Sequence, residues 1–177
     1  IPGVGTGQDL PLLPTGVEVV AGDLTWAMMS RAVGKAQGRS VHFQILDGQQ
    51  LPFADGSFDA VLLFLVLCVV PDGARALEEA WRVLREGGRI GVFDKFRPKG
   101  QPLTRSRRLF GRIIRRLGTD PNRVWEQMSS AIPCQAVTTE DGRWFCGHYR
   151  MIWLRKERIG PGRTMEDRGP VPKGQRA

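Results

Sequence analysis

Segments typical of strands and segments typical of helices alternate along the first half of the chain. The strand candidates are Val17–Ala21, Val41–Leu46, Phe58–Leu67 and Arg89–Asp94. Two segments have helical spacing, 26–35 and 74–85. Thr25 could cap the first, and Gly87 and Gly88 should end the second by adopting left-handed backbone angles. Strands that alternate with helices form βαβ units, so the sequence predicts an α/β fold with a mostly parallel sheet and helices on both faces.

The second half of the chain has a different pattern. Residues 95–123 hold ten basic residues and one acid, and we interpret 95–130 as a basic lid or insertion, helical over 102–117. Two strand-like segments, Cys134–Thr139 and His148–Arg155, predict an antiparallel hairpin at the sheet edge, with its turn at Glu140–Gly142. The tail over 157–177 is rich in proline and glycine and is expected to be disordered. Residues 1–156 should form one domain.

The composition is that of a globular chain. With 41% hydrophobic and 25% charged residues, 177 residues can bury a core. The longest apolar run, Ala60–Val70, is about half as long as a membrane-spanning helix requires, and no signal-peptide pattern opens the chain. Three scattered cysteines without a CxxC pair suggest neither a disulfide framework nor a metal site. We therefore expect a cytoplasmic protein.

The chain opens with a glycine-rich loop. Gly3, Gly5 and Gly7 alternate in a turn that normally follows a buried strand, so we expect that strand to be truncated here. Asp23 follows twenty residues after Gly3, at the end of the next strand, where a carboxylate can accept hydrogen bonds from both ribose hydroxyls of a nucleoside. A dinucleotide site would have glycine in place of Gln8, and Pro11 limits the following helix to about two turns. The loop therefore predicts a nucleoside site that does not take NAD or FAD.

Further motifs follow in a fixed order: Leu46–Val61 (LDGQQLPFADGSFDAV), Val69–Asp72 (VVPD) and Arg82–Arg89 (RVLREGGR). Together with the glycine loop they resemble the class I S-adenosylmethionine-dependent methyltransferases, and among these the branch that methylates quinones, phospholipid amines and other small molecules. The resemblance covers 3–96 and continues more weakly to 156. It implies a Rossmann-like fold, S-adenosylmethionine as the cofactor, and methyl transfer to a small-molecule or lipid-like acceptor of the quinone, phospholipid-amine or thiol class.

The resemblance also implies cofactor-binding residues: Gly3, Gly5, Gly7, Asp23, Leu24, Asp47, Gly48, Gln49, Leu63 and Phe64. The three loop glycines would lie under the methionine part and Asp23 would hold the ribose. Asp47 would accept from the adenine amine, with the N–H of Gly48 or Gln49 on a ring nitrogen. Leu63 and Phe64 would flank the sulfonium methyl. Structural alternatives remain for several of them: Asp23 as a helix cap, Asp47 as a turn cap, and Leu63 and Phe64 as core residues.

Two departures from the family pattern leave a second function open. Ile1 stands where the family usually has a carboxylate that helps to fix the methionine amino group, and Cys68 and Val69 stand where many relatives have histidines. Methyl transfer gains mainly from alignment and the exclusion of water. The sequence does not identify the base that would take a proton from the acceptor, so we assign no catalytic residue. Cys68 and His42 are expected to be structural. The alternatives are a non-catalytic, cofactor-binding methyltransferase-like domain and, less favoured, an RNA methyltransferase.

The basic segment allows two interpretations. Apolar residues within 103–117 form one face of a helix, with arginines around it. We favour a lid helix that turns its arginines to solvent, and the alternative is peripheral contact with an anionic membrane. The net charge of +8 raises nucleic acid as a partner, but the segment lacks aromatic stacking platforms, so nucleic acid is not expected. Nothing in the sequence predicts the oligomeric state.

Overall fold

The computed structural model describes residues 1–97, 122–132, 136–144 and 149–157, with the backbone alone for 136–144. The predicted helix over 102–117, its membrane contact over 103–117 and the tail from 158 lie outside the described residues. The strands are β1 (Glu18–Asp23), β2 (Ser40–Ile45), β3 (Phe58–Phe64), β4 (Leu84–Lys95), β5 (Ala136–Trp144) and β6 (Tyr149–Lys156). The helices are α1 (Trp26–Val33), α2 (Gly73–Val83) and α4 (Trp125–Met128), with the 3₁₀ turns η1 (Leu10–Leu12) and η2 (Ser129–Ala131).

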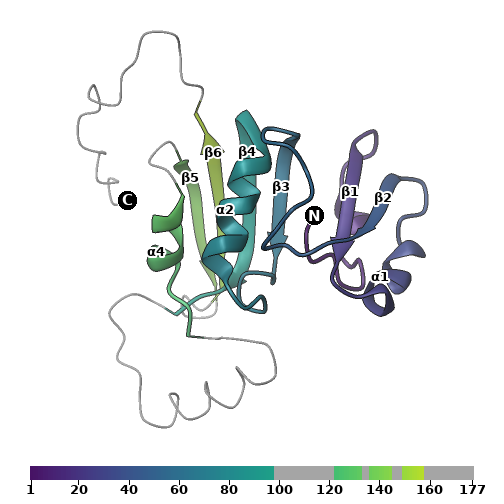
Figure 1. Ribbon diagram of the computed structural model, residues 1–177, viewed down its shortest axis with the longest axis horizontal. Coiled ribbons are helices and arrows are strands. Elements are labelled where there is room, and N and C mark those ends of the chain that lie inside the picture. The colour runs from purple at the N-terminus through teal and green to yellow at the C-terminus, as the bar shows by residue number, and fades with distance from the viewer. Residues whose placement is uncertain (98–121, 133–135, 145–148, 158–177) are drawn as a thin grey trace.

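The strands form two neighbouring sheets (Figure 1). β1 and β2 pair in parallel, and the second sheet has the order β3-β4-β6-β5, with β3 and β4 parallel and the other pairs antiparallel. The N-terminus lies between the sheets, where Pro2 makes an isolated parallel bridge to Gly22 of β1. The predicted α/β fold and the antiparallel pair at the C-terminal edge are confirmed.

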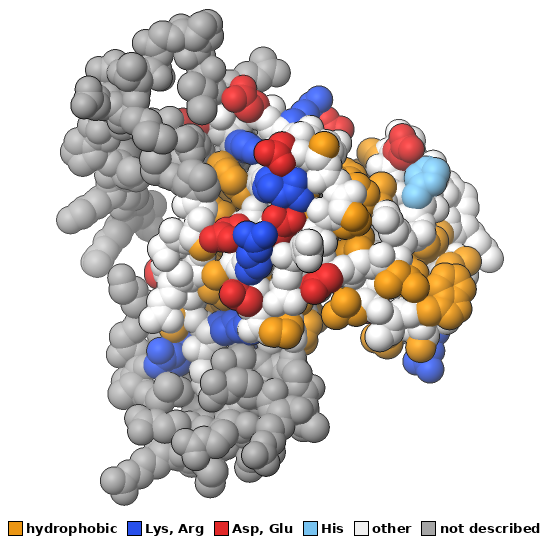
Figure 2. All heavy atoms as spheres, in the orientation of Figure 1, with side chains coloured by type: hydrophobic (Ala, Val, Ile, Leu, Met, Phe, Trp, Pro, Cys, Tyr) orange, Lys and Arg blue, Asp and Glu red, His pale blue; other side chains and the backbone are white. Residues whose placement is uncertain are grey.

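Two apolar clusters fill the space between strands and helices. The larger lies under α2 and α4, where Leu63, Leu77 and Ile152 are fully buried. The smaller packs α1 on β1, through Met29 and Ala21. The outer face of α2 carries alternating acidic and basic side chains (Figure 2), including the ion pair of Arg75 with Glu78. No helix among the described residues is long and apolar enough to cross a bilayer.

A half-buried ion pair of α2 holds the loop after β2. Glu79 accepts from the N–H of Leu51 at 2.8 Å and from Arg82. The Arg82 guanidinium also donates to the carbonyls of Leu51 and Phe53. The polar segment between β2 and β3 is thereby fixed beside the carboxyl end of β2, where the site lies.

Several predicted boundaries are wrong. β3 ends at Phe64 instead of Leu67. Helix α2 ends at Val83, because Leu84 already pairs with Phe58 in the sheet, so Gly87 and Gly88 do not cap the helix. Gly87 instead bends β4 with a φ of 78°, and a Cβ at Gly88 would lie 2.8 Å from the carbonyl oxygen of Asp59.

The hairpin turn and the first helix also differ from the prediction. Glu140–Gly142 is part of β5 and pairs with Met151–Trp153, so the predicted turn at these residues is wrong; the connection over 145–148 lies outside the described residues. The helix after the glycine loop was expected to have about two turns, whereas η1 is a single 3₁₀ turn with Pro11 in its first turn.

Candidate functional site

A cleft of about 680 Å³ opens at the carboxyl ends of β1, β2 and β3. Open α/β sheets bind ligands at this edge. The glycine loop and the residues after β1 form one side, and the end of β3 with the segment that follows it forms another. The lining comprises Gly3, Val4, Gly5, Thr6, Gln8, Asp9, Leu12, Asp23, Leu24, Met28, Leu46, Gly48, Phe64, Leu65, Val66, Val69, Val70, Pro71, Phe93 and Met151.

The glycine loop has two glycines in the cleft and one outside it. Gly3 and Gly5 line the cleft with φ angles of 73° and 53°, which favour glycine. A Cβ at Gly3 would lie 2.5 Å from Cγ2 of Val66, whereas Gly5 has no neighbour nearer than 3.9 Å. Gly7 does not line the cleft; a Cβ there would lie 2.7 Å from Cβ of Ala32. The lack of a side chain at Gly7 therefore permits the loop to pack closely on α1.

Asp23 lies at the end of β1 and holds the loop in place. One carboxylate oxygen accepts from the N–H of Gly5 at 2.9 Å, and the other from the N–H of Thr25 at 3.3 Å. The Thr25 side chain makes no capping hydrogen bond to α1. Asp23 and Leu24 both line the cleft. Asp23 therefore supports the start of α1 and holds the glycine loop at the point where it lines the cleft.

The segment after β2 reaches the cleft through Leu46 and Gly48, while Asp47 and Gln49 do not line it. Asp47 accepts from the N–H of Gln49 at 2.8 Å and from the Gln49 side-chain amide at 3.1 Å. The Gln49 side chain in turn accepts from the N–H of Asp72 at 2.8 Å. The N–H of Gln49 is therefore engaged within the turn, whereas Gly48 lines the cleft.

The end of β3 separates two residues that were predicted together. Leu63 is fully buried in the larger core cluster, while Phe64 lines the cleft. The next residue, Leu65, has a left-handed φ of 55° and is 42% exposed, and its N–H donates to the carbonyl of Phe93 at 2.8 Å. Such a φ is uncommon for a branched side chain, and here it turns the chain from β3 into the cleft wall.

Sequence reasoning missed several lining residues. Val69, Val70, Phe93 and Met151 make the far wall apolar, and no local pattern distinguishes them from core residues. Asp9 also lines the cleft; it makes no capping hydrogen bond to η1, and burial raises the pKa of its carboxyl. A signal for Asp9 was present, because a carboxylate in a glycine-rich loop close to a predicted nucleoside site has few structural uses.

The segment after β3 is held by two polar residues outside the cleft. The buried carboxylate of Asp94 accepts from the N–H of Cys68 at 3.0 Å. Burial and the nearby Asp94 raise the pKa of the Cys68 thiol to about 12, so the thiol is protonated and structural, in line with its predicted role. Arg123 donates to the carbonyls of Leu67, Val70 and Pro71.

Among the described residues, no three or more His, Cys, Asp or Glu side chains lie close enough together to hold a metal ion. His42 lies at the surface of β2 and pairs with Glu18 at 3.1 Å.

Comparison with known proteins gives consistent matches. A family model described as a methyltransferase domain matches residues 2–92. The demethylmenaquinone methyltransferase of Roseiflexus castenholzii is 38% identical over 129 residues, which are 67% of this chain and 53% of that protein. The phosphatidylethanolamine N-methyltransferase of Cereibacter sphaeroides is 32% identical over 120 residues, 66% of this chain and 59% of that protein. The chain spans 34–59% of the length of the curated relatives it matches.

Solved structures match the fold. A geranyl diphosphate methyltransferase in complex with S-adenosylmethionine superposes with a TM-score of 0.71 at 14% identity, over 88% of this chain and 76% of that one. At this identity the likeness concerns the fold alone. The family model, however, spans more than half of the 177 residues and contains the glycine loop, Asp23 and the segment after β2. The chain therefore belongs to the class I S-adenosylmethionine-dependent methyltransferases.

Proposed function

We propose that the chain binds S-adenosylmethionine in the cleft and transfers its methyl group to an apolar, lipid-like acceptor. The observation that carries this proposal is that one cleft joins the glycine loop and Asp23 to an apolar wall made by Phe64, Val69 and Phe93. The first side suits a nucleoside with a charged amino-acid part. The second suits an apolar acceptor.

The residues of the first side fit the cofactor. Gly3 and Gly5 leave the loop backbone without side chains at the cleft, where the methionine part would lie. Asp23 would accept hydrogen bonds from the ribose hydroxyls, with Leu24 beside the sugar and Gly48 beside the adenine. When bound, the cofactor supplies an electrophilic methyl group on a sulfonium sulfur.

Asp9 has a role of its own in this proposal. Asp9 and Asp23 are the ionisable side chains among the described lining residues. Since Asp23 is engaged with the loop and would hold the ribose, we assign Asp9 to the α-ammonium group of the methionine part. The loss of water around the Asp9 carboxylate, which raises its pKa, would be offset by a cationic ligand.

The apolar wall would do two things for methyl transfer. It would exclude water from the sulfonium group, and it would hold the acceptor in line with the methyl carbon and the sulfur. Leu65, whose backbone conformation is fixed by its hydrogen bond to Phe93, would define the point at which the acceptor approaches. In this proposal alignment, more than acid–base catalysis, accelerates the reaction.

The names of the relatives suggest the acceptor class. One relative is a demethylmenaquinone methyltransferase and another a phosphatidylethanolamine N-methyltransferase. Both acceptors are lipids, which agrees with the apolar wall of the cleft. We therefore propose a lipid quinol or a phospholipid amine as the acceptor, ahead of a thiol.

Calorimetry with S-adenosylmethionine tests the cofactor site. Asp23→Asn should weaken binding by about 1.5–3 kcal/mol, the worth of a hydrogen bond to a charged group. Asp59→Asn is the matched control, because Asp59 is an exposed aspartate paired with Arg85 at the opposite end of β3. Absence of binding to the unaltered chain, or equal binding by Asp23→Asn, would contradict the proposal.

Turnover is tested by measuring S-adenosylhomocysteine formed with quinol or phosphatidylethanolamine in mixed micelles. Product formation with either acceptor supports the enzyme. Tight cofactor binding without product from either acceptor would favour the non-catalytic alternative.

A further inference from the structure

A pair of polar side chains borders the apolar end of the cleft. Lys95 of β4 and Tyr149 of β6 lie directly opposite each other in the antiparallel register, two residues beyond the pair Phe93 and Met151. Side chains two residues apart on a strand share a face of the sheet. Because Phe93 and Met151 line the cleft, the same face carries Lys95 and Tyr149 to its border.

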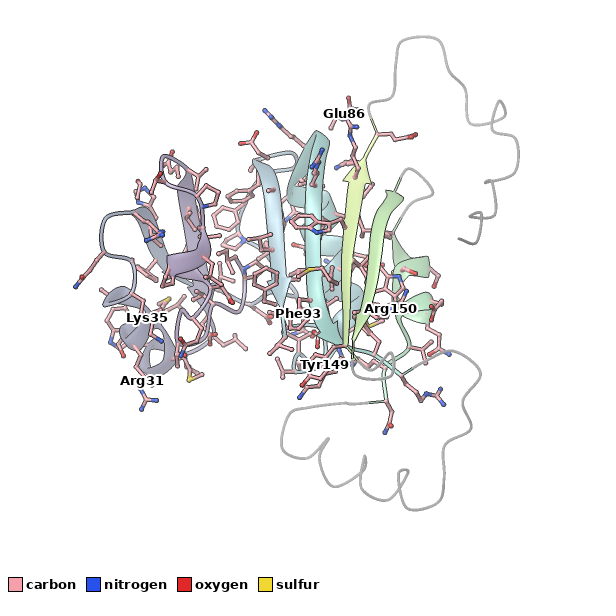
Figure 3. All side chains as sticks on the ribbon, turned by 180° about the vertical axis from the view of Figure 1, so that it is seen from behind. Arg31, Lys35, Glu86, Phe93, Tyr149 and Arg150 are labelled. Carbon is pink, nitrogen blue, oxygen red and sulfur yellow. The ribbon has the colours of Figure 1, made fainter. Side chains whose placement is uncertain are left out.

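Three of the four side chains are in contact, with Tyr149 between Phe93 and Lys95. The Tyr149 ring stacks on Phe93 with 5.7 Å between centroids and 27° between planes. The Lys95 ammonium lies 5.3 Å from the centroid of the Tyr149 ring. Figure 3 shows Phe93 and Tyr149 close together at one end of the strands, on the face turned away from α2.

Lys95 places a positive charge at the apolar end of the cleft. The described lining residues themselves include no lysine or arginine. The Tyr149 side chain, more than any other group, raises the pKa of the Lys95 ammonium, so the ammonium is cationic at neutral pH. Both residues are half-buried, which leaves them accessible to a ligand while weakening the screening by water.

We propose that Lys95 and Tyr149 bind the acceptor and select one that carries a hydroxyl on an aromatic ring, held as its oxyanion. This inference rests on the proposed function and narrows its acceptor class. The Lys95 ammonium favours the oxyanion, and the Tyr149 ring, stacked on Phe93, offers a flat surface for the acceptor ring. The same ammonium disfavours a protonated amine, so a quinol is preferred over a phospholipid amine.

The step balances without a further reactant. The acceptor hydroxyl releases its proton to water, and the electron pair that remains is shared with the ring. An electron pair of the oxygen, or of a ring carbon conjugated with it, forms the bond to the methyl carbon while the bond from carbon to sulfur breaks and leaves its pair on sulfur. The sulfonium becomes a neutral thioether and the acceptor anion becomes neutral. If a ring carbon is methylated, its proton leaves to water, which restores the aromatic ring as its oxyanion, and the oxygen takes a proton from water to regain the hydroxyl.

A spectroscopic titration tests the pair. A nitronaphthol, whose oxyanion absorbs visible light, is titrated in the presence of S-adenosylhomocysteine, which prevents turnover. The pKa of the bound probe should fall by about one unit or more below that of the free probe. Lys95→Met should abolish the shift, and Tyr149→Phe, which keeps the ring, should reduce it. Arg155→Met is the matched control, because Arg155 is an exposed cation on the same face of β6, six residues from Tyr149.

A second measurement compares a neutral ligand with a cationic ligand of the same shape. Naphthalenemethanol should bind the unaltered chain about tenfold more tightly than naphthalenemethylamine, which is cationic, and Lys95→Met should remove this difference. Tighter binding of the amine by the unaltered chain would overturn the inference.

Calorimetry with S-adenosylmethionine separates the two proposals. If the unaltered chain does not bind the cofactor, the proposed function fails. If it binds the cofactor but leaves the pKa of the nitronaphthol unchanged, or if the lowered pKa persists in Lys95→Met, the inference about Lys95 and Tyr149 fails and the cofactor site stands. Thermal unfolding of each variant checks that it is folded.

Discussion

The carboxylate of Asp23 accepts a hydrogen bond from the N–H of Gly5 at 2.9 Å, although 18 residues separate them in the chain. This bond ties the glycine loop to the end of β1, and the second oxygen of Asp23 accepts from the N–H of Thr25 at the start of α1. The residue proposed to hold the ribose is thus also the residue that positions the loop. Loop order and cofactor affinity should be coupled through Asp23.

Replacement of Asp23 should therefore affect the chain even without ligand. Asp23→Ala removes the acceptor for two backbone N–H groups, and we expect a loss of about 1–3 kcal/mol in the free energy of unfolding. Asp23→Asn keeps one acceptor oxygen and should lose less. Urea unfolding without cofactor measures both, and equal stability of Asp23→Ala and the unaltered chain would show that the loop does not depend on this carboxylate.

The loop glycines should differ in what they contribute. Gly7→Ala adds a clash with Cα and Cβ of Ala32, at 2.8 and 2.7 Å, to the strain of a left-handed backbone, so it should cost more than about 2 kcal/mol of stability. Gly5→Ala meets no atom nearer than 3.9 Å and should cost about 1–2 kcal/mol from the backbone alone. Urea unfolding ranks the two variants, and a less stable Gly5→Ala would contradict the assignment of Gly7 to packing.

Replacement of Asp9 should affect binding of the amino-acid part of S-adenosylmethionine but not binding of its nucleoside part. Asp9→Asn should weaken the binding of S-adenosylmethionine about tenfold, because it removes the charge opposite the α-ammonium group. The same change should leave 5′-methylthioadenosine unaffected, since that nucleoside has no amino-acid part. Calorimetry with both ligands measures this, and equal weakening of both would place Asp9 outside the methionine subsite.

The sequence predicts the order of elements well and their ends less well. Apolar runs and helical spacing locate β1 to β4, α1 and α2, because these patterns reflect burial in a layered fold. Leu65 illustrates the limit. Its left-handed backbone follows from the hydrogen bond to Phe93 and the packing of Val66 under Gly3, and both partners are remote in sequence. A local pattern that reads as apolar strand through Leu67 contains no trace of either contact.

Turn-forming residues misled the prediction where a neighbouring strand supplies the hydrogen bonds. Glu140–Gly142 has the composition of a turn, yet each residue pairs with β6. Gly87 and Gly88 suggest a helix end, yet they bend and pack β4.

For the cleft, the sequence identifies lining residues that have a left-handed backbone or a carboxylate bonded to the loop, such as Gly3, Gly5 and Asp23. It misses Phe93 and Met151, which differ from core residues only in which face of the sheet they occupy.

Two buried carboxylates should respond to pH in opposite directions. Burial raises the pKa of Asp94 above its usual 3.8, so its contribution to stability is fully present below that value and is lost as the pH rises through the raised pKa. The hydrogen bond from Arg82 lowers the pKa of Glu79 below its usual 4.5, so its contribution is present above that value and is lost as the pH falls through the lowered pKa. Asp94→Asn should therefore gain stability relative to the unaltered chain as the pH rises from acid to neutral, while Glu79→Gln should lose stability over the same change.

Urea unfolding at a series of pH values measures both differences against the unaltered chain. The comparison between variants matters, because all other titrating groups contribute equally to each curve and cancel. Asp94→Asn retains an acceptor for the N–H of Cys68, so its response reports the charge more than the lost hydrogen bond. If Asp94→Asn lost stability relative to the unaltered chain as the pH rose, the carboxylate of Asp94 would not be desolvated as the structure has it. If Glu79→Gln gained stability over the same change, the hydrogen bond from Arg82 would not lower the pKa of Glu79.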